Sequence, residues 1–165
     1  MIRARLQSDA FLQVGFNRRF APLAVQARDR LKAAGGTKYV LLRVNAGQLP
    51  DDSWQNAAEE GNGRILGEVC HFVDLARFLV DDDIKTVQAA TQGACDDLTV
   101  SLNFADGSLA TIAYTALGDT AYSKELVEAF AGGTVININD FRGLTVTSGG
   151  KESKIGRSME QDKGH

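Results

Sequence analysis

The chain has 165 residues, of which 44% are hydrophobic, and a formal net charge of -3. This length suits one domain, or slightly more, with a real hydrophobic core. The acidic balance, with no basic run longer than Arg18-Arg19, argues against a nucleic acid or an anionic membrane as a partner. Cys70 and Cys95 are too few for a disulfide framework, and no apolar stretch reaches the roughly 18 residues of a membrane span. We therefore expect a soluble protein of the reducing cytoplasm, with small molecules or proteins as partners.

The first third of the chain predicts a strand, a helix and a second strand. The apolar run Phe11–Phe16, which ends at polar residues, is typical of a short buried strand. Pro22, followed by leucine and alanine at helical spacing as far as Gly35, predicts a helix over 22–34. Tyr39–Val44 is rich in β-formers, and a long loop over 45–63 follows it.

Residues 63–80 predict a second, amphipathic helix. Its polar residues recur at every third position and form a band along the boundary of the apolar face. The band consists of Glu68, His71, Asp74 and Arg77, and the predicted apolar face consists of Ile65, Leu66, Val69, Phe72, Val73, Ala76, Leu79 and Val80.

The second half of the chain has the period-two pattern of an antiparallel meander. Strands are predicted over 99–104, 109–116, 126–131, 134–138 and 144–147, with turns at Asp106-Gly107 and Gly132-Gly133. The fold class is therefore α+β: an open, mainly antiparallel sheet of about five or six strands with helices packed on one face. The other face is mixed rather than charged at Thr99, Ser101, Thr111 and Thr115, and we expect another subunit to cover it.

His71 is the candidate proton carrier, because a neutral imidazole accepts or donates a proton near pH 7 and the oxidation of a hydroxyl needs such an acceptor. Glu68 or Asp74 could orient the ring or raise its pKa. The alternative is a structural contact of His71 at the helix edge, with its charged neighbours paired in water. Neighbouring Cys70 points about 100° away, and neither Cys-x-x-Cys nor His-x-x-x-His spacing occurs, so no metal site is predicted.

Three further residues are substrate-binding candidates. Trp54, in the long loop, is either a packing anchor or a platform on which a sugar ring stacks. Arg43 and Asn45, at a strand end, either bind substrate hydroxyls or only hold the loop.

Three ordered motifs carry a family resemblance. They are Val14-Gly-Phe-Asn-Arg-Arg-Phe-Ala-Pro22, then Gly-Asn-Gly followed after six residues by Cys-His71-Phe-Val-Asp-Leu-Ala-Arg-Phe78, then Phe104-Ala-Asp-Gly-Ser108. Together they resemble the glucose-fructose oxidoreductase, inositol dehydrogenase and MocA family over nearly the whole chain. The branch fused to a zinc alcohol-dehydrogenase-like segment is the most similar.

The resemblance implies that this chain is the second half of such a protein, with the dihydrodipicolinate-reductase-like C-terminal fold. Residues 1–20 would end a dinucleotide-binding domain, 21–150 would form the domain for substrate binding and oligomerisation, and 151–165 would be a polar lead-in to a truncated C-terminal helix. Asn17 and Arg18 would lie near the nicotinamide of NAD or NADP. His71 would match the family's histidine, with Arg43 and Asn45 facing the hydroxyls of a sugar-like substrate.

The family's glycine loop and its lysine-bearing segment would precede this sequence, so we expect no hydride transfer by the chain alone. One departure matters: Gly67 stands where the family has an aspartate one helical turn before the histidine, and Glu68 is one position away. The sequence thus predicts a substrate-binding and oligomerisation domain of an NAD(P)-dependent oxidoreductase. The alternative is a non-catalytic module whose sheet serves assembly or ligand binding.

Overall fold

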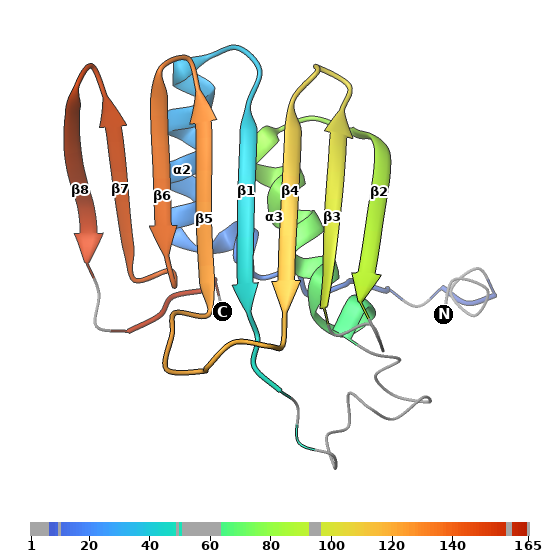
Figure 1. Ribbon diagram of the computed structural model, residues 1–165. Coiled ribbons are helices and arrows are strands. Elements are labelled where there is room, and N and C mark those ends of the chain that lie inside the picture. The colour runs from blue at the N-terminus through green and yellow to red at the C-terminus, as the bar shows by residue number, and fades with distance from the viewer. Residues whose placement is uncertain are drawn as a thin grey trace.

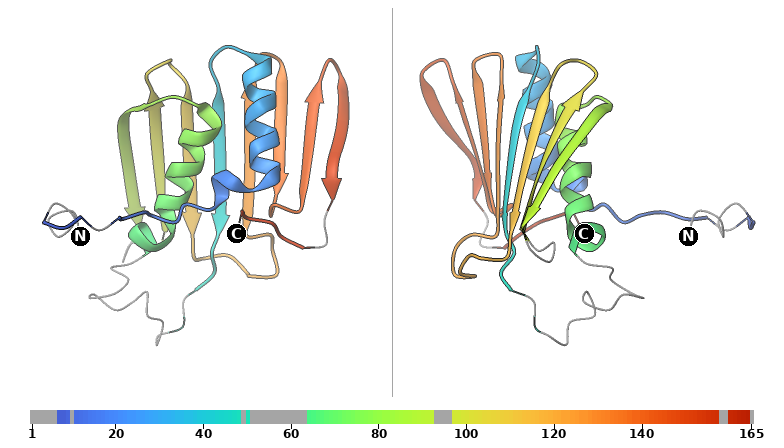
Figure 2. Two further views of the ribbon diagram at one scale, coloured as in Figure 1. Left: turned by 180° about the vertical axis from the view of Figure 1, so that it is seen from behind. Right: turned by 45° about the vertical axis from the view of Figure 1, so that its right-hand side comes forward.

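The computed structural model describes residues 7–9, 11–48, 50, 64–92, 97–157 and 160–164. Within these residues, one open sheet of eight strands has the order β2-β3-β4-β1-β5-β6-β7-β8, and the two α-helices cover one of its faces (Figures 1 and 2). This confirms the predicted α+β class. The strands are β1 (Tyr39–Asn45), β2 (Ile84–Gln92), β3 (Asp97–Phe104), β4 (Leu109–Thr115), β5 (Glu125–Ala131), β6 (Thr134–Asn139), β7 (Gly143–Ser148) and β8 (Lys151–Arg157); the helical elements are η1 (Arg18–Phe20), α2 (Pro22–Ala34), η3 (Ile65–Val69) and α3 (Cys70–Val80).

Strand β1 is the centre of the sheet and the element that organises it. It pairs in parallel with β4 and antiparallel with β5, whereas every other pairing between described strands is antiparallel. Val40, Leu42 and Val44 point to the helix-covered face and are at most 2% exposed. The core therefore lies between this face and the two helices.

Helix α2 has the bounds that the sequence predicts. Pro22 occupies its first turn, where a missing N–H costs nothing, and Gly35 ends it at φ 71°. Ala24, Ala27 and Leu31 are buried against β5, β6 and β7. Small side chains at these positions allow the helix to lie close to the sheet.

Helix α3 continues a π-helical turn, η3, that the sequence analysis did not predict. The predicted apolar face is wrong at Ile65 and Leu66, which are 40% and 62% exposed, and it omits Leu75, which is fully buried. Each residue of a π-turn advances less around the axis than in an α-helix, so the apolar stripe of α3 does not continue through η3. Within the described residues, no helix is both long and apolar enough to cross a bilayer.

The two edge strands, β2 and β8, were not predicted. Every residue of β2 after Ile84 is exposed, and β8 falls in the segment 151–165 that was interpreted as the polar lead-in to a helix. Both strands are held by backbone pairing with β3 or β7 and bury little apolar surface, so neither has a clear hydrophobic pattern. The predicted strand Phe11–Phe16 is wrong: it pairs with no described strand, and Phe11 is 85% exposed.

Candidate functional site

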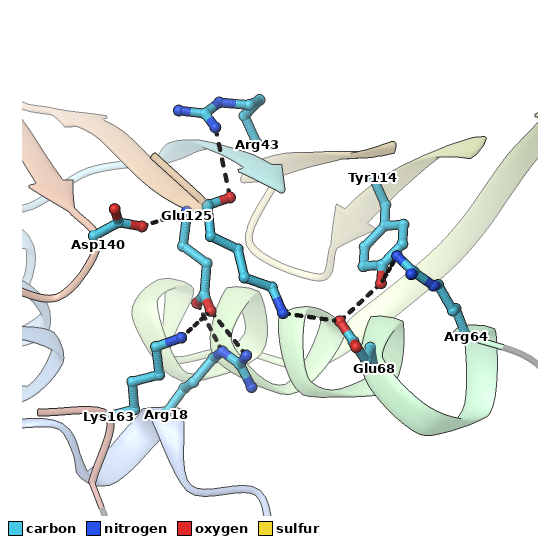
Figure 3. Close-up of polar contacts among 9 residues, drawn as sticks. Arg18, Arg43, Arg64, Glu68, Tyr114, Glu125, Asp140 and Lys163 are labelled. Carbon is cyan, nitrogen blue, oxygen red and sulfur yellow. Dashed lines mark hydrogen bonds and ion pairs between the residues drawn. The ribbon is translucent and has the colours of Figure 1, made fainter. Parts of the chain in front are cut away.

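Polar side chains gather at one end of the sheet, where β1 and β4 end and β5 begins (Figures 1 and 3). The start of the α3 helical segment and the short helix η1 reach the same end, and so does the C-terminal segment that carries Lys163. Two carboxylates, Glu125 and Glu68, each form the centre of a separate cluster there.

The Glu125 cluster is closed to solvent. Glu125 is 1% exposed and accepts hydrogen bonds from Arg18 Nε at 2.8 Å, Arg18 Nη2 at 3.0 Å and Lys163 Nζ at 2.6 Å. Burial alone would raise the pKa of this carboxyl, but the bonds and charges of Arg18 and Lys163 bring its pKa below the usual range. The guanidinium of Arg18 also lies 4.4 Å from the centre of the Phe72 ring.

His71 lies in the first turn of α3, beside this cluster. Its ring meets Phe16 edge-on at 5.5 Å between centroids, and its buried Nδ1 has no hydrogen-bond partner. Partial burial lowers the pKa of the imidazole, and the positive charge of Arg18 lowers it further against the opposing carboxylates Asp74, Glu68 and Glu125. His71 is therefore neutral at pH 7 and able to accept a proton.

The other polar residues of the α3 band have partners outside the helix. Asp74 accepts two hydrogen bonds from Arg19, one of them from Nε at 2.8 Å. Arg77 pairs with Asp83 at 2.6 Å on the exposed surface beyond the helix end. These residues are thus not paired with each other, and Asp74 fixes η1 against α3.

The Glu68 cluster is only partly covered. Tyr114, at the end of β4, donates its hydroxyl hydrogen to Glu68 Oε2 at 2.7 Å and accepts a hydrogen bond from Arg64 Nη1 at 3.2 Å. A guanidinium only donates, so the hydroxyl proton must point to Glu68, whose carboxyl oxygen accepts it. Burial and this carboxylate raise the pKa of Tyr114 well above its usual value. Lys124 Nζ lies 3.5 Å from the same oxygen, and its side chain is 39% exposed.

Arg43 and Asn45 hold the loop between β4 and β5. Arg43 donates to the Ser123 carbonyl at 2.5 Å and to Ser123 Oγ at 2.9 Å. Asn45 Nδ2 donates to the Asp119 carbonyl at 2.7 Å. Of the two interpretations left open by the sequence, this geometry fits the structural one. Trp54 lies outside the described residues.

Five residues of the two clusters were not named as candidates from the sequence, and one of them, Arg64, directly precedes η3. Tyr114, Lys124, Glu125 and Lys163 are distant in the chain from the α3 segment and reach it only through the sheet topology and the C-terminal segment. Only Glu125 gave a sequence signal: it is an acidic residue at an inward position of an otherwise apolar alternation, Glu125–Ala131.

The structure is thus a domain with an open sheet, helices on one face of the sheet, and a polar site of ionisable side chains at one end of it. The model of the GFO/IDH/MocA C-terminal domain family matches residues 26–135, and the chain belongs to that family. The relation to the branch fused to a zinc alcohol-dehydrogenase-like segment stays a prediction. A search among curated proteins finds no match.

Solved structures share the fold at low sequence identity. The inositol dehydrogenase homolog of Azotobacter vinelandii complexed with NAD+ is 13% identical with a TM-score of 0.73, over 87% of this chain and 43% of its own. Levoglucosan dehydrogenase in complex with NADH is 18% identical with a TM-score of 0.69, over 87% of this chain and 45% of its own. The super-repressor mutant of Gal80p from Saccharomyces cerevisiae is 13% identical with a TM-score of 0.78, over 99% of this chain and 50% of its own. The chain thus spans about half the length of these proteins.

The described residues do not fit a dinucleotide by themselves. Helix α2 begins with Pro22, which has no N–H to offer a phosphate, and the N–H of Cys70 at the start of α3 is bonded back to Ile65. Arg18 is buried, and its Nε and Nη2 are hydrogen-bonded to Glu125. Among the described residues, no group of three or more His, Cys, Asp or Glu side chains is arranged to hold a metal ion.

Proposed function

We propose that this chain is the substrate-binding and oligomerisation domain of an NAD(P)-dependent oxidoreductase that acts on a sugar-like polyol or carbonyl compound. Family membership supports the oxidoreductase class, and two of the similar structures are complexes with NAD+ or NADH. The observation that carries the proposal is His71: a neutral imidazole, adjacent to two carboxylate clusters, at the polar end of the sheet. His71 takes up the proton of the substrate hydroxyl, or returns it in the reverse direction.

The neighbouring residues position His71 and the substrate. Arg18 holds Glu125 and lowers the pKa of the His71 imidazole. Through these contacts Arg18, together with Asn17, shapes the end of the site where the nicotinamide of the cofactor would lie. Glu68 supplies a carboxylate one position after Gly67, where the family's aspartate is absent. Tyr114 holds this carboxylate through a hydrogen bond. Arg43 and Asn45 act through the loop that they hold.

The cofactor, NAD or NADP, belongs with a dinucleotide-binding half in the full-length protein. That the chain spans about half of the similar structures supports this arrangement. The isolated chain should therefore show no dehydrogenase activity, and measurable NAD(P)H formation by it would refute the proposal. The two cysteines favour the reducing cytoplasm as its location.

The direct test is turnover of the full-length protein with NAD+ or NADP+ and a panel of sugars and inositols. His71→Ala should lower kcat by roughly a hundredfold or more, the usual contribution of a general base. Cys70→Ala, at the adjacent position, is the matched control and should retain activity. Unchanged turnover in His71→Ala would exclude the histidine as the proton carrier.

A second candidate is a non-catalytic assembly or ligand-binding module. The likeness to the super-repressor mutant of Gal80p supports it, because the name of that protein refers to repression and not to an oxidoreductase activity. Gly67 supports it as well, since it stands where the family has an aspartate one helical turn before His71. Sugar binding by the full-length protein without any turnover, with either nicotinamide cofactor, would favour this candidate.

We also propose that the helix-free face of the sheet joins two copies of the chain. Tyr39 pairs in register with Leu109 on one side and Phe130 on the other, and the three side chains are 41%, 44% and 36% exposed. They form an apolar patch across three neighbouring central strands, at the end of this face where β1 and β4 begin. Light scattering should show an oligomer that Phe130→Lys weakens, and a monomer at high concentration would contradict the proposal.

A further inference from the structure

Lys124 differs from the other cations at the polar end of the sheet in how loosely it is held. Arg18 and Arg64 are at most 8% exposed, and the side chain of Lys163 is 16% exposed at 2.6 Å from its carboxylate. The Lys124 side chain is 39% exposed, and its ammonium is 3.5 Å from Glu68. At that distance the ion pair is weak and easily exchanged for another anion.

The backbone of Lys124 is nevertheless fixed. Its carbonyl accepts a hydrogen bond from the Asn45 N–H at 2.8 Å and lies 3.5 Å from Arg43 Nη1. Arg43 also holds the preceding residue, Ser123. Only the side chain of Lys124 can therefore reorient, and its ammonium is the part that lies near Glu68.

The residues around the Lys124 ammonium are fixed. Tyr114, which is 1% exposed, holds Glu68, and Arg64, which is 2% exposed, holds Tyr114 (Figure 3). Charges of both signs gather at this end of the sheet, and the loosely held ammonium of Lys124 is the group that can pair with an anion. The cations are Arg18, Arg43, Arg64, Lys124 and Lys163, and the carboxylates are Glu68, Asp97, Asp119, Glu125 and Asp140.

We infer that Lys124 is a specificity-determining residue that binds an oxyanion on the substrate, so that the preferred substrate is an acidic sugar-like compound rather than a neutral one. The ammonium leaves Glu68 and pairs with the carboxylate or phosphate of the ligand, while Tyr114 keeps Glu68 in place. The inference rests on the proposed function, because it names the class of substrate for the same site.

The experiment is calorimetric binding of glucuronate, glucose 6-phosphate and glucose to the full-length protein with its nicotinamide cofactor. At least one charged sugar should bind about tenfold more tightly than glucose, and the tighter of the two identifies the anion as carboxylate or phosphate. Lys124→Met should remove this preference and its sensitivity to added salt, so that the charged sugars bind the variant no more tightly than glucose does. Lys85→Met, which removes an exposed lysine at the start of β2 and thus at the other end of the sheet, is the control and should leave the preference intact.

Two outcomes would overturn the inference, and they separate it from the proposed function. If glucose binds as tightly as both charged sugars, or if Lys124→Met weakens all three equally, Lys124 does not select an anion and the oxidoreductase proposal stands. If none of the sugars binds, the proposed sugar-like substrate fails as well. Because Lys124 is exposed, its substitution should leave the fold intact, and circular dichroism checks this.

Discussion

The Glu125 and Glu68 clusters use the same kinds of residue at the same end of the sheet, yet they differ in burial. Glu125 is 1% exposed and has two cations at hydrogen-bonding distance, whereas the side chain of Glu68 is 18% exposed and has its lysine at 3.5 Å. A buried charge needs its partners for the fold to persist, but a half-exposed pair can lose its partner at little cost. The first cluster therefore supports the fold around the site, and the second is the one that we propose to contact a ligand.

The largest effect should follow from the loss of the buried carboxylate. Glu125→Gln leaves Arg18 and Lys163 with uncompensated charge, and the free energy of unfolding should fall by about 3 kcal/mol. Glu128→Gln, on the same strand but facing the opposite side of the sheet, is the control and should change it by less than about 0.5 kcal/mol. Urea unfolding measures both, and equal values would remove the distinction between the clusters.

The same carboxylate gives a pH dependence. Its pKa is lower in the folded state than the unperturbed 4.5, so its stabilisation is fully present above pH 4.5 and is lost as the pH falls toward the folded pKa. Urea midpoints measured between neutral and acidic pH should decline more steeply for the parent chain than for Glu125→Gln. Parallel curves would show that Glu125 is not held ionised by its partners.

An intermediate effect is expected at the base of the Glu68 cluster. Tyr114→Phe removes a hydroxyl that donates to Glu68 and accepts from Arg64, and stability should fall by about 1 to 2 kcal/mol. Tyr39→Phe changes a tyrosine that is 41% exposed on the other face, and should cost much less. If Tyr114→Phe is neutral in urea unfolding, the base of this cluster is not rigid.

A matched pair of lysines sharpens the comparison between the clusters. Lys163→Met removes a 2.6 Å bond to a buried carboxylate and should cost about 1 kcal/mol, because Arg18 still compensates Glu125. Lys124→Met removes a longer, exposed pair and should cost less than about 0.5 kcal/mol. The reverse order in thermal or urea unfolding would contradict the assignment of Lys124 to a ligand.

The smallest effect concerns the protonation of His71. Because its pKa is lowered in the folded state, NMR titration should place the imidazole midpoint below 6.5. The unfolded chain therefore binds a proton at His71 more readily than the folded chain does. As a result, the free energy of unfolding is highest above pH 6.5 and decreases as the pH falls toward the lowered folded pKa. His165→Gln leaves one titrating imidazole. A midpoint above 6.5 would mean that the carboxylates, and not burial and Arg18, control the ring.

The sequence predicted the elements that bury one face, because burial of one face requires apolar residues at regular spacing. Helix α2, the central strand β1 and strands β3 to β7 each present alternating or helical apolar positions to the core. The edge strands β2 and β8 depend on backbone pairing with one neighbour, which leaves no such record. Phe11–Phe16 shows the converse: an apolar run forms no strand where no described strand pairs with it.

Helical spacing predicted the candidate site only where it lies on one helix, and Arg18 was named from the family resemblance alone. His71 and Glu68 were identified from the spacing along α3, but Tyr114, a hydrogen-bond partner of Glu68, lies on a strand and is 46 positions away in the sequence. The π-turn η3 also changed the direction of Glu68 relative to His71, and periodicity does not reveal such a turn. Long-range pairing thus decides which of these polar residues meet.

The most direct test of the central claim is the pH dependence of kcat/KM for substrate oxidation by the full-length protein. If His71 accepts the proton, kcat/KM should rise with pH through an apparent pKa below 6.5, and His71→Asn should lose this limb together with most of its activity. An identical limb in the parent and the variant would contradict the claim, because another group would then carry the proton.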